Sequence, residues 1–114
     1  MQDRRKFKRR QVTYYLKVYD QTSGELIGHL VDISPGGVML LGMDPCPVGN
    51  NFEMKIILPA EILGKTELFL NAECKWSARD INPDYYDSGF QLADISEDDA
   101  KVIEWLVQRY GFRG

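Results

Sequence analysis

Arginine is concentrated at the start of this chain. Residues 1–10 contain six of its fourteen lysine and arginine residues and a single carboxylate, a formal charge of +5, whereas the rest of the chain carries −8. Within this stretch Arg4, Arg5 and Arg9 have the spacing RRxxxR. A guanidinium group can hold two phosphate oxygens at once, because its planar N–H donors match their separation. We therefore expect this basic arm to bind a partner with concentrated negative charge, and phosphate in particular. The alternative is a solvated basic tail.

A second group of candidate residues lies in the segment Asp-Ile-Ser-Pro-Gly-Gly, which contains Asp32, Ser34 and Gly37. A carboxylate accepts hydrogen bonds, a hydroxyl group can donate one, and a glycine allows a sharp turn or the close approach of a ligand. The same residue types form ordinary turns between strands. The segment is thus both a predicted strand-ending turn and a candidate binding site, and the two interpretations are compatible.

The sequence contains no clear set of residues for hydrolytic, redox or transfer chemistry. His29 is the only histidine, and we interpret it as a solvent-facing or hydrogen-bonded strand residue. Cys46 and Cys74 have neither a metal-ligand spacing nor a disulfide framework, so we expect free thiols in a reducing cytoplasm, with Cys74 as a small core residue. The acidic run 97–99 is explained by helix capping. The sequence therefore favours a binding module over an enzyme, with no metal and no cofactor.

The elements that must position these residues follow from the hydrophobic pattern. Alternating apolar residues predict six strands, at about residues 12–19, 25–32, 38–41, 52–58, 68–78 and 89–93, with Pro59 ending the fourth. Ser96 is a good N-cap for an amphipathic helix at about 97–110, and Gly111 can end it. Short turns and one closing helix indicate an all-β barrel with a C-terminal helix, six-stranded and antiparallel. We expect residues 1–11 to be a flexible basic arm, because like charges repel, and residues 12–114 to form one domain.

Taken together, the RRxxxR arm and the motif Asp32-x-Ser34-x-x-Gly37 resemble the PilZ domain, the bacterial receptor module for cyclic di-GMP. The family's paired signature has the same two halves in the same order. The resemblance extends to the strand around Trp76, to the segment Gly-Phe-Gln-Leu beginning at Gly89 and to the closing helix. It therefore covers nearly the whole chain and implies a PilZ-type barrel.

The resemblance implies a role for each motif residue. Arg5 and Arg9 would contact phosphate and guanine, with Arg4 in support, since an arginine can grip the O6 and N7 acceptors of guanine or stack on its face. The Asp32 carboxylate suits the N1–H and N2–H donors of guanine, and the Ser34 hydroxyl suits phosphate or a guanine acceptor. Gly37 would let the ligand approach.

Two positions remain open in this interpretation. Trp76 shares its strand face with Leu70 and Cys74, which favours a core position, whereas some relatives place a tryptophan in this strand against a guanine. Lys8 stands where many relatives have a proline before the last arginine, so the free arm would be more mobile and its ordering on binding more costly. Lys8 and Arg10 would add only general attraction. One ligand molecule or a stacked pair would both fit the family.

The leading hypothesis is a cytoplasmic cyclic di-GMP receptor that changes shape on binding and acts on a downstream protein in motility, exopolysaccharide production or a related response. One rival is a PilZ-fold adaptor that binds no nucleotide, which the intact motifs count against. Another is a small barrel that binds single-stranded nucleic acid through its arm, with strong salt dependence. The charge of −8 beyond residue 10 counts against a long polyanion track, and we expect neither a nucleic acid nor a membrane as partner.

Overall fold

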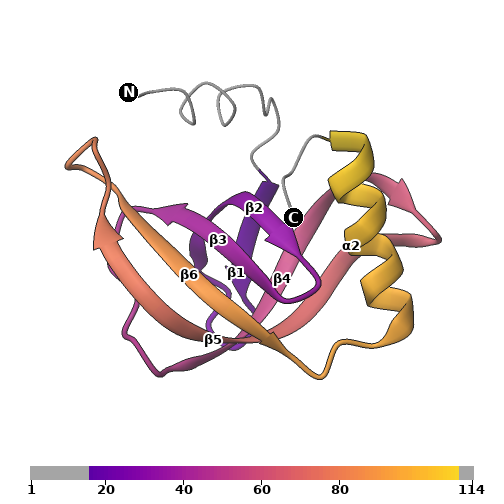
Figure 1. Cartoon of the computed structure of the whole chain (residues 1–114), viewed down its shortest axis with the longest axis horizontal. Helices are drawn as coiled ribbons and strands as arrows, with labels where there is room; N and C mark the ends of the chain where they lie inside the picture. Colours follow the sequence, from indigo (N-terminus) through magenta and orange to yellow (C-terminus); the bar gives the residue numbers. More distant parts are fainter. Residues whose placement is uncertain (1–15, 111–114) are drawn as a thin grey trace.

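A computed structural model describes residues 16–110 of the chain, and in it six antiparallel strands close into a barrel with a helix packed against one end (Figure 1). The strand order around the barrel is β1-β2-β3-β6-β5-β4. The elements are β1 (Leu16–Asp20), β2 (Leu26–Ser34), β3 (Gly37–Gly42), β4 (Asn51–Ile62), β5 (Lys65–Arg79), β6 (Tyr86–Ala93) and α2 (Glu97–Tyr110). The predicted fold class is confirmed, and none of the helices in the described part of the chain is long and apolar enough to cross a membrane.

The core is the inner face of the barrel, as the alternating pattern predicts. Leu16 and Val18 of β1 are buried, and Leu68, Leu70, Ala72 and Cys74 supply alternate inner positions of β5. Helix α2 adds three fully buried side chains that close one end of the barrel, Val102, Ile103 and Leu106. Burial of these aliphatic groups provides the main driving force for folding.

Helix α2 begins where the sequence predicts. The Ser96 hydroxyl accepts a hydrogen bond from the Asp99 N–H at 3.1 Å, and the Ser96 carbonyl accepts one from the Ala100 N–H at 2.9 Å. This is the N-cap arrangement, which satisfies N–H groups that have no partner within the helix. Lys65 lies 3.7 Å from a carboxylate oxygen of Asp99, and this partly buried ion pair joins the helix to the β4–β5 hairpin.

The fourth strand does not end at Pro59, so that boundary was wrong. Strand β4 continues to Ile62, with a register shift between Ile57 and Ile62. A proline is tolerated at such an irregularity, where its missing N–H breaks no regular ladder. Leu63 and Gly64 then have positive φ angles of 51° and 83°, as a two-residue hairpin turn of type I′ requires. Leucine gives no turn signal, and the sequence therefore did not reveal this hairpin.

The predicted face of the fifth strand is correct only as far as Cys74. The register shifts between Cys74 and Trp76, because Lys75 is an extra residue with no partner on β6. Such a β-bulge reverses the alternation beyond it. Trp76 is consequently 44% exposed on the outer face, and Ala78 is exposed too. The core position that Trp76 could have taken is excluded.

Candidate functional site

The predicted site residues of the barrel meet on its outer face, where four strands lie side by side. Asp32 of β2 pairs with Met39 of β3, Met39 with Gly89 of β6, and Gly89 with Trp76 of β5. Side chains at directly paired positions project from the same face of a sheet. Asp32, Met39 and Trp76 therefore lie in one row, although Trp76 is far from the other two in the sequence.

A second row runs parallel to the first. Ser34 pairs with Gly37, Gly37 with Gln91, and Gln91 with Glu73. Between the two rows Ile33, Val38, Phe90 and Cys74 pair across the same strands and point into the core. The Asp32-x-Ser34 spacing therefore places two polar side chains outward with one apolar side chain inward between them.

Two bulges turn Asp32 and Trp76 outward. In β2 the register shifts between Leu30 and Asp32, and Val31 is the extra residue. Continued regular pairing from Leu30 with Leu40 would place Asp32 opposite Val38, which is buried. Bulges are frequent beside functional sites, where they redirect a side chain.

The bulge in β5 likewise turns a side chain outward. Regular pairing from Cys74 with Phe90 would place Trp76 opposite Ser88, which is 2% exposed. The extra residue Lys75 brings Trp76 opposite Gly89 instead. The two bulges lie at opposite ends of the same row. Together they place a carboxylate and an indole on the outer face of the sheet.

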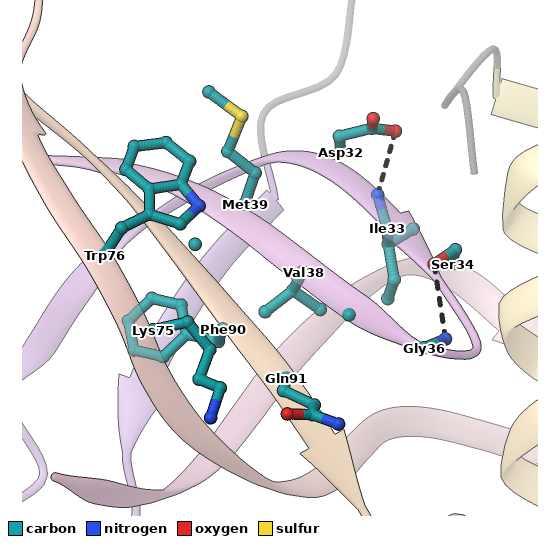
Figure 2. Close-up of a pocket in the computed structure, with 12 residues that line it drawn as sticks. Asp32, Ile33, Ser34, Gly36, Val38, Met39, Lys75, Trp76, Phe90 and Gln91 are labelled. Atoms are coloured by element: carbon teal, nitrogen blue, oxygen red, sulfur yellow. Dashed lines mark hydrogen bonds between the residues drawn. The ribbon is translucent and has the colours of Figure 1, made fainter. Parts of the chain in front are cut away.

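Hydrogen bonds hold the polar end of the site in shape. One carboxylate oxygen of Asp32 accepts from the Ile33 N–H at 3.0 Å, and the Ser34 hydroxyl accepts from the Gly36 N–H at 3.2 Å (Figure 2). The Gly36 carbonyl accepts from the Leu92 N–H at 3.1 Å, which ties the turn to β6. The segment is thus the strand-ending turn that the sequence predicts. The hydroxyl hydrogen of Ser34 is not used in its bond to Gly36 and can be donated.

Two glycines allow the strands and side chains of this site to approach closely. A Cβ atom on Gly37 would lie 2.6 Å from the carbonyl oxygen of Phe90, so only glycine permits this pairing of β3 with β6. Gly37 does not have a positive φ, and close strand packing rather than a sharp turn explains it. A Cβ atom on Gly89 would overlap the indole of Trp76, at 2.9 Å from Cδ1 and nearer still to Nε1. The indole therefore lies directly over the backbone of β6.

Together these residues line a shallow pocket of about 320 Å³. Figure 2 shows Trp76 and Met39 at one end and Asp32 and Ser34 at the other. Lys75 and Gln91 also line the pocket, and the Lys75 ammonium lies 3.6 Å from a carboxylate oxygen of Glu73. The arrangement offers a flat aromatic surface, a carboxylate acceptor and a hydroxyl donor to a ligand with a planar base and polar edges.

Sequence reasoning identified part of this pocket. It named Asp32, Ser34, Gly37 and Trp76, while Arg4, Arg5 and Arg9 lie outside the described residues. It missed Met39, Lys75, Gly89 and Gln91 as lining residues. A glycine inside a strand indicates a bulge or a close approach, but the predicted strand began at Gly89, whereas β6 begins at Tyr86, so this signal was missed.

The two cysteines lie beside the site and are free thiols. Cys74 is fully buried, and its thiol lies 3.6 Å from the carbonyl oxygen of Cys46. Burial is the main cause that raises the pKa of the Cys74 thiol, and burial likewise raises the pKa of Cys46. A thiol with a raised pKa is a poor nucleophile and metal ligand. Among residues 16–110 there is no cluster of three or more histidine, cysteine or acidic side chains that could hold a metal ion.

Comparison with known proteins gives a consistent result. A family model described as PilZ domain matches residues 3–109. The Bacillus subtilis inhibitor of motility MotI/DgrA has a similar structure, with a TM-score of 0.68 and 19% identity over 84% of this chain and 46% of that chain. The PilZ domain of Escherichia coli YcgR, solved with c-di-GMP, gives a TM-score of 0.61 and 13% identity over 85% of this chain and 81% of that chain. This chain thus spans about half the length of the MotI chain. No curated protein matches it closely enough to count as a relative.

Proposed function

Because the chain belongs to the PilZ domain family, we propose that it is a receptor for cyclic di-GMP and binds this nucleotide on the outer face of β2, β3, β6 and β5. The observation that supports the proposal best is the convergence of Asp32, Ser34 and Trp76 around one pocket. Each of these side chains matches one part of the ligand, and two independent bulges are needed to bring Asp32 and Trp76 to that face.

The chemistry of the pocket suits guanine better than adenine. The indole of Trp76 supplies a surface on which a base can stack. The Asp32 carboxylate, oriented by its bond to the Ile33 N–H, can accept hydrogen bonds from the N1–H and N2–H groups of a guanine. Adenine does not present this pair of donors. Ser34 can donate its hydroxyl hydrogen to a phosphate oxygen.

The basic arm completes the proposed site. Arg5 and Arg9 would bind phosphate and guanine, with Arg4 in support, and the barrel face would hold the other side of the nucleotide. Binding would neutralise the repulsion among the cations of residues 1–11 and order that arm on the barrel. Ordering of a segment by a ligand is a known type of switch, and here it would change the surface that a partner protein contacts.

The output of this switch would be non-enzymatic. We propose that the protein transmits cyclic di-GMP levels to a downstream protein in motility, exopolysaccharide production or a related response. A cytoplasmic location agrees with this intracellular ligand and with the free thiols of Cys46 and Cys74.

A calorimetric titration with cyclic di-GMP tests the proposal. The parent chain should bind, whereas Arg5→Ala and Arg9→Ala should each weaken binding by at least about tenfold, since charge-assisted arginine contacts contribute about 1.5–3 kcal/mol each. Asp32→Asn should weaken it similarly, because the asparagine keeps one acceptor oxygen but places its NH2 donor against the second guanine donor. Arg10→Ala is the matched control, since it removes the same charge from the arm outside the motif.

Two results would contradict the proposal. The first is the absence of binding heat with the parent chain at roughly 50 μM protein, a concentration at which a micromolar complex is readily detected. The second is equal binding by Arg5→Ala, Arg9→Ala and Arg10→Ala, which would leave only general electrostatic attraction. Binding to single-stranded oligonucleotides that strengthens with strand length would favour the nucleic-acid alternative.

A further inference from the structure

The geometry of β5 and β6 points to Gly89 as the residue that positions Trp76, and we propose that an empty Cβ position at Gly89 is what lets the indole lie flat as the aromatic wall of the nucleotide site. The inference rests on the proposed function, because it concerns the same pocket. It assigns a role to a residue outside both sequence motifs.

The position of Gly89 supports this role. Gly89 is buried in the centre of the first row, paired with Met39 on one side and Trp76 on the other. In the Gly89 position a Cβ atom would come within 3 Å of three indole atoms of Trp76. Real Cβ atoms do not show such contacts, so any larger residue at this position must displace the ring.

The bulge and the glycine act together. Lys75 is the extra residue that shifts Trp76 from a position opposite Ser88 to a position opposite Gly89. The bulge alone would turn the indole outward, away from the sheet. The glycine allows it to lie over the backbone of β6 as well, where its exposed face forms part of the pocket wall.

The change Gly89→Ala isolates this effect. Alanine is better tolerated than glycine in the interior of a strand, so the substitution does not weaken β6 by itself. The nearest atoms belong to the Trp76 side chain, which can rotate away, and the strand need not move. We therefore expect a folded barrel in which Trp76 has left its place over β6.

The test is a double-mutant cycle on cyclic di-GMP binding. The parent chain, Gly89→Ala, Trp76→Ala and the double variant are titrated calorimetrically, with thermal unfolding as a check of folding. Base–aromatic stacking contributes about 1–3 kcal/mol per base, so Gly89→Ala and Trp76→Ala should each weaken binding by about tenfold or more. In the double variant the loss should equal that of Trp76→Ala alone, because Gly89 acts through the indole.

Fluorescence supplies a measurement that needs no ligand. In a Trp105→Phe background Trp76 is the only tryptophan. Adding Gly89→Ala should shift its emission to longer wavelength and increase its quenching by acrylamide, because the displaced ring is more exposed to water. A purely structural role of Gly89 would lower the unfolding temperature without this specific change.

The outcomes separate the two hypotheses. If the parent chain does not bind cyclic di-GMP, the proposed function fails. If the parent chain and Gly89→Ala bind equally well and the Trp76 emission is unchanged, the proposed function stands and the role of Gly89 is overturned. A further loss from Gly89→Ala in the Trp76→Ala background would also overturn it, since Gly89 would then act by another route.

Discussion

Cys74 and Trp76 stand two residues apart on β5, and their environments are opposite. The thiol is fully buried in the core, whereas the indole is nearly half exposed in the candidate site. A regular strand would have given both the same environment. The extra residue Lys75 explains this difference. Because of it, the Cys74 side chain lies in the core and the Trp76 side chain lies at the candidate site.

The raised pKa values of the Cys46 and Cys74 thiols predict lower stability at alkaline pH. Burial raises the pKa of Cys46 and Cys74 in the folded protein above that of the unfolded chain, so the folded state keeps its thiol protons longer. The stabilisation is fully present below about pH 8.5, where an unfolded thiol ionises, and is lost as the pH rises through the folded-state pKa. The free energy of unfolding should therefore fall as the pH is raised from about 8 to 10.

Urea unfolding at a series of pH values measures this dependence. Tyrosine and lysine also titrate towards the upper end of the range, so the comparison is with a Cys46→Ala/Cys74→Ala variant. Its unfolding free energy should decline less steeply with pH than that of the parent chain. Equal slopes in the two proteins would show that the thiols do not contribute.

At the scale of elements, helix α2 closes one end of the barrel, and its first turn is held by the N-cap residue Ser96. Ser96→Ala removes the hydroxyl that accepts from the Asp99 N–H and should lower the free energy of unfolding by about 1 kcal/mol. Ser96→Asp supplies another capping oxygen and should retain most of the stability. Chemical denaturation of the three proteins measures the difference. A Ser96→Asp variant as unstable as Ser96→Ala would argue against capping as the cause.

The same scale explains what the sequence could predict. Alternation within one strand predicted the inner residues of β1 and of β5 up to Cys74, and capping chemistry predicted α2 from Ser96 onward. The bulges at Val31 and Lys75 were not predictable, because a bulge is a mismatch between two paired strands and leaves little trace in either one alone.

The sequence therefore predicted only some of the residues that line the candidate site. Asp32, Ser34 and Gly37 were found from their spacing, since the turn that carries them is local in sequence. Met39 and Gln91 could not be found, because only the cross-strand register of β3 with β6 brings them to the pocket. Trp76 was ambiguous for the same reason, and the pairing of β5 with β6 resolved it.

At the scale of the whole molecule, the candidate ligand-binding groups lie in two parts of the chain that carry opposite net charge. The first ten residues carry a formal +5 and the remainder −8. The six strands close into a barrel within residues 16–110, and these residues supply a continuous buried core. We therefore expect folding to depend on the barrel and nucleotide affinity to depend on both parts.

Deletion of residues 1–11 tests this division. The shortened chain should keep its barrel, seen as an unchanged circular dichroism spectrum and cooperative unfolding, because the six strands and the buried core of the described part lie outside the deleted segment. Its affinity for cyclic di-GMP should fall by at least about a hundredfold, since the two arginine contacts of the proposed site contribute about 1.5–3 kcal/mol each.

In the parent chain, NMR titration should show ligand-induced changes both in residues 1–11 and at Asp32, Gly37 and the indole N–H of Trp76. If saturating nucleotide perturbs only the barrel, or if the deletion leaves affinity intact, the arm is not part of the receptor and its charge must serve a different partner.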